Sequence, residues 1–424
     1  MRLHLNPGLV IHPFDGAGHV PRVVCEIPHR SGRPVHVLLP MTIVSVLQKC
    51  EPADGISALA ASMSERAGGR VPASQCADLV REQLMPRGVI VDLDAELAES
   101  DMKRRDDYLT IKVRLLSRPI VFAIARNLVW LCKKSVVAFI LAAVVLTHIF
   151  VIGLAYRDGA AGLAAFTAPS AIILMGLVSV QVLWHEIGHA TALVKYGGQR
   201  PEIGWGLYLW YFVMFTDLSE AWQMPRKARF HIDLAGIYFQ SMFLILFSLL
   251  WLSTHQNIWI YALYATDLHL AGNLNPFLRM DGYWALVDAL GLTTLRNFSV
   301  ARLLRKGDGA GRNRLPELTP LMKRIVGLYA VGSIAFYSSL LFILGREIYK
   351  FALTLPSLLL SWHHIDNSDL GRDTALHLAW KLLIFVLCCA ILVRMAMRLM
   401  NAVLPEGAAR PRSFFIGRRG VSRA

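Results

Sequence analysis

Five residues near the middle of the chain, His185-Glu186-Ile187-Gly188-His189, have the types and the spacing of a metal-dependent hydrolase site. Positions four apart lie on one face of a helix, so the two imidazoles can bind a single metal ion. Glu186 projects from the next position and can take a proton from the attacking water without binding the metal. The surrounding run is apolar enough for a membrane span, where ionisable side chains are costly and usually functional. The pattern therefore predicts a zinc hydrolase site rather than a pair of satisfied buried histidines.

A third ligand must come from elsewhere in the chain, because a catalytic zinc takes three protein ligands and keeps one position open. The downstream candidates are Asp217, Asp233, Asp267, His269 and Asp281. Asp281 lies five residues after Pro276, which ends the preceding apolar run. We expect the backbone after this proline to be non-helical and to line a cavity inside the protein. Irregular backbone of this kind often supplies metal ligands in membrane proteins. The spacing favours Asp281 and keeps His269 as its rival.

The composition is that of a multi-span membrane protein: 55% of the 424 residues are hydrophobic and 17% charged, with a mean hydropathy of +0.45. We expect a mainly α, polytopic fold of about six transmembrane helices with a membrane-embedded zinc site. The predicted spans are Ser135–Tyr156, Ala168–Tyr196, Ala228–Leu252, Asn257–Asn275, Ile325–Leu344 and Ala375–Met400. Tyr349–Trp362 is apolar but short and contains Pro356, which indicates a re-entrant or interfacial segment.

The formal net charge of +14 comes from Lys and Arg that gather before the first span, between the second and third, and between the fourth and fifth. The positive-inside rule then puts both termini in the cytoplasm of a multi-pass protein of a bacterial cell membrane. The basic excess favours contact with the lipid bilayer, and no basic module interleaved with aromatic residues indicates nucleic-acid binding. The six cysteines include no CxxC pair, and we expect them to carry no chemistry.

Residues 1–95 are soluble in character and predict a small α+β domain. The expected strands are Leu9–Ile11, Arg22–Ile27, Val35–Leu39 and Val89–Val91, and the expected helices are Met41–Cys50, Gly55–Ala67 and Pro72–Met85. Residues 96–134 read as a linker and a basic amphipathic segment on the membrane surface. The catalytic membrane core follows at 135–290, then a basic cytoplasmic loop at 291–324, C-terminal transmembrane helices at 325–403 and a basic cytoplasmic tail at 404–424.

The HEIGH motif in a membrane span, followed about ninety residues later by NPxxxxDG, resembles the site-2 protease family of intramembrane zinc metalloproteases. The stretch from Pro201 to Phe239 is similar to the peptide zinc metalloprotease branch of that family. The resemblance covers roughly residues 108–300. It implies one zinc ion per chain bound by His185, His189 and Asp281, with Glu186 as the general base and Asn275 in contact with substrate.

The N-terminal domain resembles PqqD-like winged-helix domains through its opening NPGLVIHP, a helix beginning near Met41, and LVREQLMPRGVIVD. Such domains recognise leader peptides of ribosomally made, modified peptides. The resemblance implies a peptide or precursor-peptide ligand that adds a strand to the exposed sheet edge. The alternative is a packing or dimerisation domain without a peptide ligand.

The apolar run Ile203–Phe215 predicts a membrane-level hairpin whose edge pairs with an extended substrate, and the alternative is an ordinary span interrupted by Gly204 and Gly206. Three functions remain open. The leading one is an intramembrane zinc endopeptidase that removes the leader of a ribosomally made, modified peptide. The second is regulated intramembrane proteolysis of a membrane-anchored signalling protein. The third is a non-catalytic peptide-binding scaffold, which Glu186 argues against. A homo-oligomer and biosynthetic partner enzymes are both compatible with the sequence.

Overall fold

The computed structural model describes residues 3–16, 21–28, 34–49, 55–67, 71–85, 87–92, 109–158, 168–208, 211–292, 295 and 319–361, together with 385, 386, 389 and 393. The chain divides into two compact units. The first is Met1–Thr294 with Leu315–Leu318, and the second is Leu295–Arg314 with Thr319–Ala424. Most of the predicted linker, the basic loop and the C-terminal tail lies outside the described residues.

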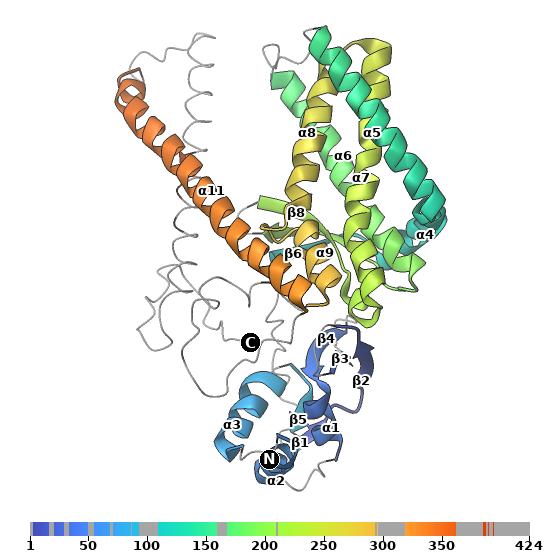
Figure 1. Cartoon of the computed structure of the whole chain (residues 1–424), viewed down its shortest axis with the longest axis vertical. Coiled ribbons are helices and arrows are strands. Elements are labelled where there is room, and N and C mark those ends of the chain that lie inside the picture. Colours follow the sequence, from blue (N-terminus) through green and yellow to red (C-terminus); the bar gives the residue numbers. More distant parts are fainter. Residues whose placement is uncertain are drawn as a thin grey trace. The chain divides into compact units, whose positions relative to one another are not determined.

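The strands and helices predicted for residues 1–95 form, with one additional strand (Figure 1). The strands β2 (Val10–Phe14), β3 (Arg22–Ile27) and β4 (Val35–Pro40) make an antiparallel sheet in the order β2-β3-β4. The helices are α1 (Met41–Lys49), α2 (Gly55–Ala67) and α3 (Ala73–Asp78), which continues into the helical turn η1 (Leu79–Leu84). The strand β1 (Leu3–Leu5), which was not predicted, pairs with the predicted closing strand β5 (Ile90–Asp92).

The core of this domain follows from the alternation of β3, whose residues Val23, Cys25 and Ile27 all turn toward the helices. They pack with Leu59 of α2 and Leu84 of η1 in one buried cluster. Burial raises the pKa of the Cys25 thiol to about 11, so the thiol stays protonated. Cys25 therefore acts as a small apolar side chain, as predicted.

Helices α5 (Lys134–Arg157), α6 (Ala168–Lys195), α7 (Arg226–Thr254) and α8 (Asn257–Leu274) form a bundle in the first unit (Figure 1). Helix α7 lies at the centre and contacts α5, α6, α8 and the short helix α9 (Asp281–Leu290). Its buried residues Phe247 and Trp251 pack with Leu263 of α8, far along the bundle from the HEIGH motif. Helix α7 therefore connects every element that carries a predicted site residue.

Four helices of the described residues are long and apolar enough to cross a membrane: α5, Pro169–Lys195 of α6, α7, and Pro320–Thr354 of α11 (Pro320–Ser361). They coincide with four of the six predicted spans. The fourth predicted span is the helix α8, but it is not apolar enough along its length, because it carries Asp267, His269 and Asn273. The sixth predicted span lies outside the described residues except for four positions.

The segment predicted to be re-entrant or interfacial at Tyr349–Trp362 is not a separate element, and its relation to the membrane interface stays a prediction. Helix α11 is continuous over 42 residues and contains Pro356. A proline inside a helix removes one backbone hydrogen bond and crowds the preceding turn. Here the proline lies in the last two turns of α11, so the rest of the helix can form without that bond. The sequence signal for an interruption was real, but its effect is limited to the helix end.

A three-stranded antiparallel sheet lies beside the bundle in the order β6-β7-β8. The predicted hairpin is confirmed as β7 (Ile203–Tyr208) and β8 (Tyr211–Thr216), so the alternative of an interrupted span is wrong. The third strand, β6 (Leu109–Leu116), comes from the segment predicted to lie on the membrane surface, and it precedes α4 (Arg118–Leu128). Gly204 is needed here because a side chain would meet the Val113 carbonyl oxygen at 2.7 Å.

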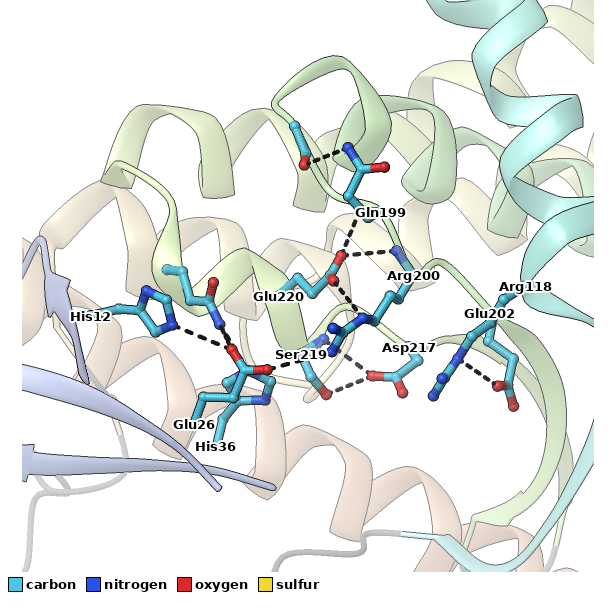
Figure 2. Close-up of polar contacts among 12 residues, drawn as sticks. His12, Glu26, His36, Arg118, Gln199, Arg200, Glu202, Asp217, Ser219 and Glu220 are labelled. Atoms are coloured by element: carbon cyan, nitrogen blue, oxygen red, sulfur yellow. Dashed lines mark hydrogen bonds and ion pairs between the residues drawn. The ribbon is translucent and has the colours of Figure 1, made fainter. Parts of the chain in front are cut away.

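Glu202, only 1% exposed, ties this sheet to α4. Its carboxylate lies 3.2 Å from Nε of Arg114 in β6. It also lies 3.3 Å from Nε of Arg118 in α4, as Figure 2 shows for this pair. A buried carboxylate is tolerated only when it is paired, and the two guanidinium groups provide the pairing. The basic residues of this segment therefore hold the hairpin in place, whatever their relation to lipid.

Candidate metal centre

Helix α6 presents the HEIGH motif toward α7, and the two histidines point at one place. The Nε2 atoms of His185 and His189 are 3.0 Å apart, and both side chains are 4% exposed. Asp281 Oδ2 lies 2.8 Å from His185 Nε2 and 3.4 Å from His189 Nε2. These three residues form a group that could hold a metal ion. The structure thus brings together the ligand set that the sequence favoured.

Hydrogen bonds on the far side of each ring decide which nitrogen carries the proton. His189 Nδ1 lies 2.7 Å from the carbonyl oxygen of Ile232, which can only accept, so Nδ1–H donates. His185 Nδ1 lies 3.1 Å from Oε1 of Gln240 and donates to it in the same way. Each neutral ring then presents an unprotonated Nε2 to the centre. This is the tautomer that metal-binding histidines adopt when an outer partner orients them.

The consequence is a cluster of acceptors without a donor. Two nitrogen lone pairs and a carboxylate oxygen converge within 3.4 Å, and Asp281 Oδ2 has no hydrogen-bond partner. Such an arrangement is unfavourable in a buried site unless a metal ion, or a proton on one of the imidazoles, lies among the three atoms. Imidazole nitrogen with one carboxylate suits a divalent transition metal ion. Asp281 is partly exposed as a residue, but its Oδ2, which faces the histidines, is buried.

Two glycines make room for this centre. A side chain on Gly188 would meet the Ala235 carbonyl oxygen at 2.6 Å and Phe239 Cβ at 2.8 Å, so glycine lets α6 and α7 pack closely. A side chain on Gly236 would collide with Nε2 of both His185 and His189. Gly236 therefore keeps the space in front of the imidazoles clear. The close neighbour at Gly188 is therefore the helix α7.

The turn between α8 and α9 places Asp281 next to the two histidines. Helix α8 ends at Leu274, and the side-chain oxygen of Asn275 accepts the backbone N–H of Phe277 at 2.9 Å. Pro276 prevents the helix from continuing, and Asp281 is the first residue of α9. Gly282 contacts the Leu274 carbonyl so closely that a side chain would not fit, as expected for a tight exit. Asn275 stabilises this turn, and its predicted contact with substrate stays a prediction.

The other candidate ligands lie elsewhere. Asp217 accepts hydrogen bonds from Ser219, and Asp267 pairs with His148 at 3.2 Å. Asp233 is buried on α7 outside the group, beside Asp288. His269 comes close but not into the group, because its Nδ1 lies 2.8 Å from Nε2 of Gln240. His269 is therefore an outer partner of the centre rather than a ligand.

Glu186 has a defined partner as well. The Thr216 hydroxyl at the end of β8 lies 2.7 Å from Glu186 Oε2 and 2.9 Å from the Glu186 carbonyl oxygen. The side chain of Glu186 is 7% exposed. A donated hydrogen bond fixes the orientation of a carboxylate. Thr216 had no signal in the sequence, because its role depends on a hairpin folding back onto α6.

Gln240 was missed as well, although it is a polar side chain in the middle of an apolar span. It joins His185 to His269, and Asn273 approaches His269 Nδ1 at 3.3 Å. Polar residues inside a membrane helix are expensive unless they serve a purpose. That cost was the signal that could have identified Gln240 from the sequence.

We predict that Gln240→Leu weakens metal binding about 10–100-fold, because the His185 ring loses the acceptor that sets its tautomer. Competition with a chromophoric chelator would measure the affinity. Gln181→Leu is the matched control, since Gln181 is a buried glutamine of α6 that accepts from Thr266, whereas the partner of His185 Nδ1 is Gln240. Equal metal affinity of Gln240→Leu and the unchanged protein would contradict this role.

Comparison of the chain with family models, with curated proteins and with solved structures finds no match.

Proposed function

We propose that this chain is a zinc metallopeptidase whose active site lies in a membrane helix bundle. The observation that carries the proposal is the convergence of His185, His189 and Asp281 next to Glu186 on α6. Four helices long enough to cross a membrane support the location. A zinc ion with ligands at about 2.0–2.2 Å in a tetrahedral arrangement separates them by about 3.3–3.5 Å, close to the longest of the observed separations. The residues present fit zinc.

The chain's own residues then divide the chemistry. Zinc, when bound, supplies the Lewis acid that makes water nucleophilic near neutral pH. Glu186 accepts the proton of the attacking water and passes it to the leaving amine. Thr216 holds the Glu186 carboxylate in one orientation. Gln240 and the Ile232 carbonyl hold the two rings so that their Nε2 atoms face inward.

The edge of β8 supports an extended peptide as the substrate. Strand β7 pairs with β6 on one side and β8 on the other, which leaves β8 at the edge of the described sheet. An edge strand offers unpaired N–H and C=O groups that a peptide can use. Strand β8 ends at Thr216, beside Glu186, so a peptide paired with β8 would lie next to the proposed base. The water that Glu186 activates would then lie beside a backbone carbonyl of the peptide rather than beside a side chain.

Within this class, we propose that the enzyme removes the leader of a ribosomally made, modified peptide. The resemblance of residues 1–95 to leader-recognition domains supports this assignment, and the antiparallel sheet β2-β3-β4 is the type of surface to which such a peptide would add a strand. The distribution of Lys and Arg favours both termini in the cytoplasm, where such precursors are made. Regulated proteolysis of an anchored signalling protein uses the same chemistry and is the outcome to test against.

Purified protein in detergent micelles, incubated with a defined peptide library and analysed by mass spectrometry, would test the function. We expect internal cleavage products with zinc, loss of cleavage after chelation, and recovery when zinc is restored. Precursor peptides with and without their leaders, compared with single-span membrane peptides, would decide between the two substrate classes. A zinc-loaded protein that hydrolyses none of these peptides would rule out the endopeptidase.

A further inference from the structure

The N-terminal domain contacts the membrane core at the segment that joins β8 to α7, which we call the β8–α7 segment (residues 217–225). This segment begins one residue after Thr216, the partner of Glu186. It contains the short helix η3 (Ser219–Gln223) and ends at Pro225, which precedes α7. Any force on the segment therefore acts at one end on the proposed base and at the other on the central helix.

A cluster around Glu26 of β3 forms the first half of the contact (Figure 2). Gln223 Nε2 donates to Glu26 Oε2 at 2.8 Å and lies 3.0 Å from His36 Nε2. Arg200 Nη1 lies 3.4 Å from Glu26 Oε1. Glu220 accepts the backbone N–H groups of Gln199 and Arg200 at 2.8 and 3.0 Å. The cluster thus connects β3 both to η3 and to the loop before β7.

The charge states of this cluster agree with its geometry. Burial lowers the pKa of His36, which favours the neutral ring. The Gln223 amide donates to Nε2 of that ring, which sets the tautomer with the proton on Nδ1. Burial alone would raise the pKa of Glu26, but the hydrogen bonds from Gln223 and His12 and the positive charge of Arg200 hold it below its ordinary value. Glu26 is therefore ionised at neutral pH and attracts Arg200.

Phe14 and Asp15, at the end of β2, form the second half of the contact. The Phe14 ring stacks on Trp222 of η3 with centroids 5.9 Å apart. Asp15 Oδ2 accepts the backbone N–H of Arg226, the first residue of α7, at 2.9 Å. An acidic side chain at a helix N-terminus satisfies a donor that the helix itself cannot. The N-terminal domain thus provides the acceptor that begins α7.

Arg229 links the same contact to the carboxylate ligand. Its guanidinium is 3% exposed and has a partner for each of its nitrogens. Nη2 donates to the Asp15 carbonyl oxygen at 2.9 Å, Nη1 to the Met224 carbonyl oxygen at 3.0 Å, and Nε to Asp288 at 2.7 Å. Asp288 belongs to α9, the helix that begins at Asp281. One buried cation therefore connects the N-terminal domain, α7 and α9.

We propose that the N-terminal domain is a positioning element of the metal centre, acting through the β8–α7 segment on Thr216 and Glu186, and through Arg229 on α9 and Asp281. This inference rests on the proposed function and deepens it, because it makes the domain part of the catalytic assembly. A peptide that binds the N-terminal sheet can then change the rate of hydrolysis as well as the affinity for substrate. Glu26 and Asp15 are positioning residues, since they touch neither metal nor substrate.

The double variant Asp15→Ala with Glu26→Ala, in the full chain, tests the proposal. We expect faster amide hydrogen exchange in residues 217–225 and kcat about tenfold lower for a short apolar peptide from the cleavage experiment, with KM and zinc content unchanged. The matched control is Glu65→Ala with Asp78→Ala, which removes two exposed acids from α2 and α3 of the same domain. Should the first variant fold poorly, Gln223→Ala breaks the Glu26 cluster from the core side and should lower kcat in the same way.

Unchanged kcat in both the Asp15/Glu26 and the Gln223 variants, with the peptide hydrolysed normally, would overturn the positioning role and leave the proposed function intact. A chain that hydrolyses no peptide at all would instead remove the proposed function. In that case the metal centre is loaded with cobalt, and its visible absorption bands test whether the N-terminal domain positions the metal ligands. Changed bands in the Asp15/Glu26 variant, but not in the control, support this positioning role, and identical bands in all three proteins overturn it.

Discussion

Glu186→Gln should abolish peptide hydrolysis while the protein keeps its zinc. The amide retains the shape of the side chain and the oxygen that Thr216 contacts, but it cannot accept a proton at neutral pH. A general base contributes on the order of 10²–10⁴-fold to the rate, and we expect kcat to decrease by a factor in this range. Peptide cleavage by mass spectrometry and zinc by elemental analysis, on the same sample, measure both effects.

Glu347→Gln is the control for this substitution, because Glu347 is an exposed residue of α11 that pairs with Arg346 and Lys350. We expect it to hydrolyse peptide at the normal rate. If Glu186→Gln hydrolyses peptide at the normal rate as well, Glu186 is not the base and the mechanism above is wrong. If it loses both zinc and activity, Glu186 has a structural role at the ligands instead.

Asp281→Ala should lose zinc. Loss of an outer hydrogen-bond partner already weakens metal binding about 10–100-fold, and loss of a ligand should exceed that range. The effect is expected to be larger than that of Gln240→Leu, because the alanine leaves only two imidazoles to bind the ion. Zinc per chain after gel filtration, together with affinity by chelator competition, would measure it.

Asp267→Ala is the matched control for the carboxylate ligand. Asp267 lies on α8 and pairs with His148 at 3.2 Å, outside the metal group, so its loss should leave zinc in place. His269→Ala should fall between the two, because it removes only the partner of Gln240. Zinc retained in Asp281→Ala but lost in His269→Ala would make His269 the third ligand and would contradict the geometry described above.

Local patterns in the sequence were sufficient for much of the architecture. The positions of His185 and His189 four residues apart depend only on the helical repeat, which any apolar helix of this length provides. The predicted N-terminal strands and helices agree with the structure because the signals used act over only a few residues. These signals are the alternation of apolar and polar side chains and the positions of glycine and proline. The apolar run Ile203–Phe215 allowed either a hairpin or an interrupted span. The structure shows the hairpin β7–β8, whose strand β7 also pairs with β6.

Local sequence patterns could not predict the contacts between distant segments of the chain. The choice of Asp281 over His269 depends on where α8 ends and how α9 turns back, and the spacing left both open. Gln240, Thr216 and Gly236 acquire their roles only when α7 and β8 lie against α6. Helix α8 was predicted as a span, but its hydropathy is lower than that of the four candidate spans. One reason is His269, a polar residue of α8 that contacts Gln240 of α7 inside the bundle.

The sequence by itself determined that a His-Glu-His site lies within an apolar helix and that a small α+β domain precedes the membrane bundle. Only the tertiary structure decided which carboxylate completes the site, which residues orient its side chains, and that Asp15 and Glu26 contact the segment leading from Thr216 to α7. The physical reason is range: helical periodicity and hydropathy act between neighbours in the chain, whereas ligand geometry and the contact between the two regions depend on residues up to about two hundred positions apart.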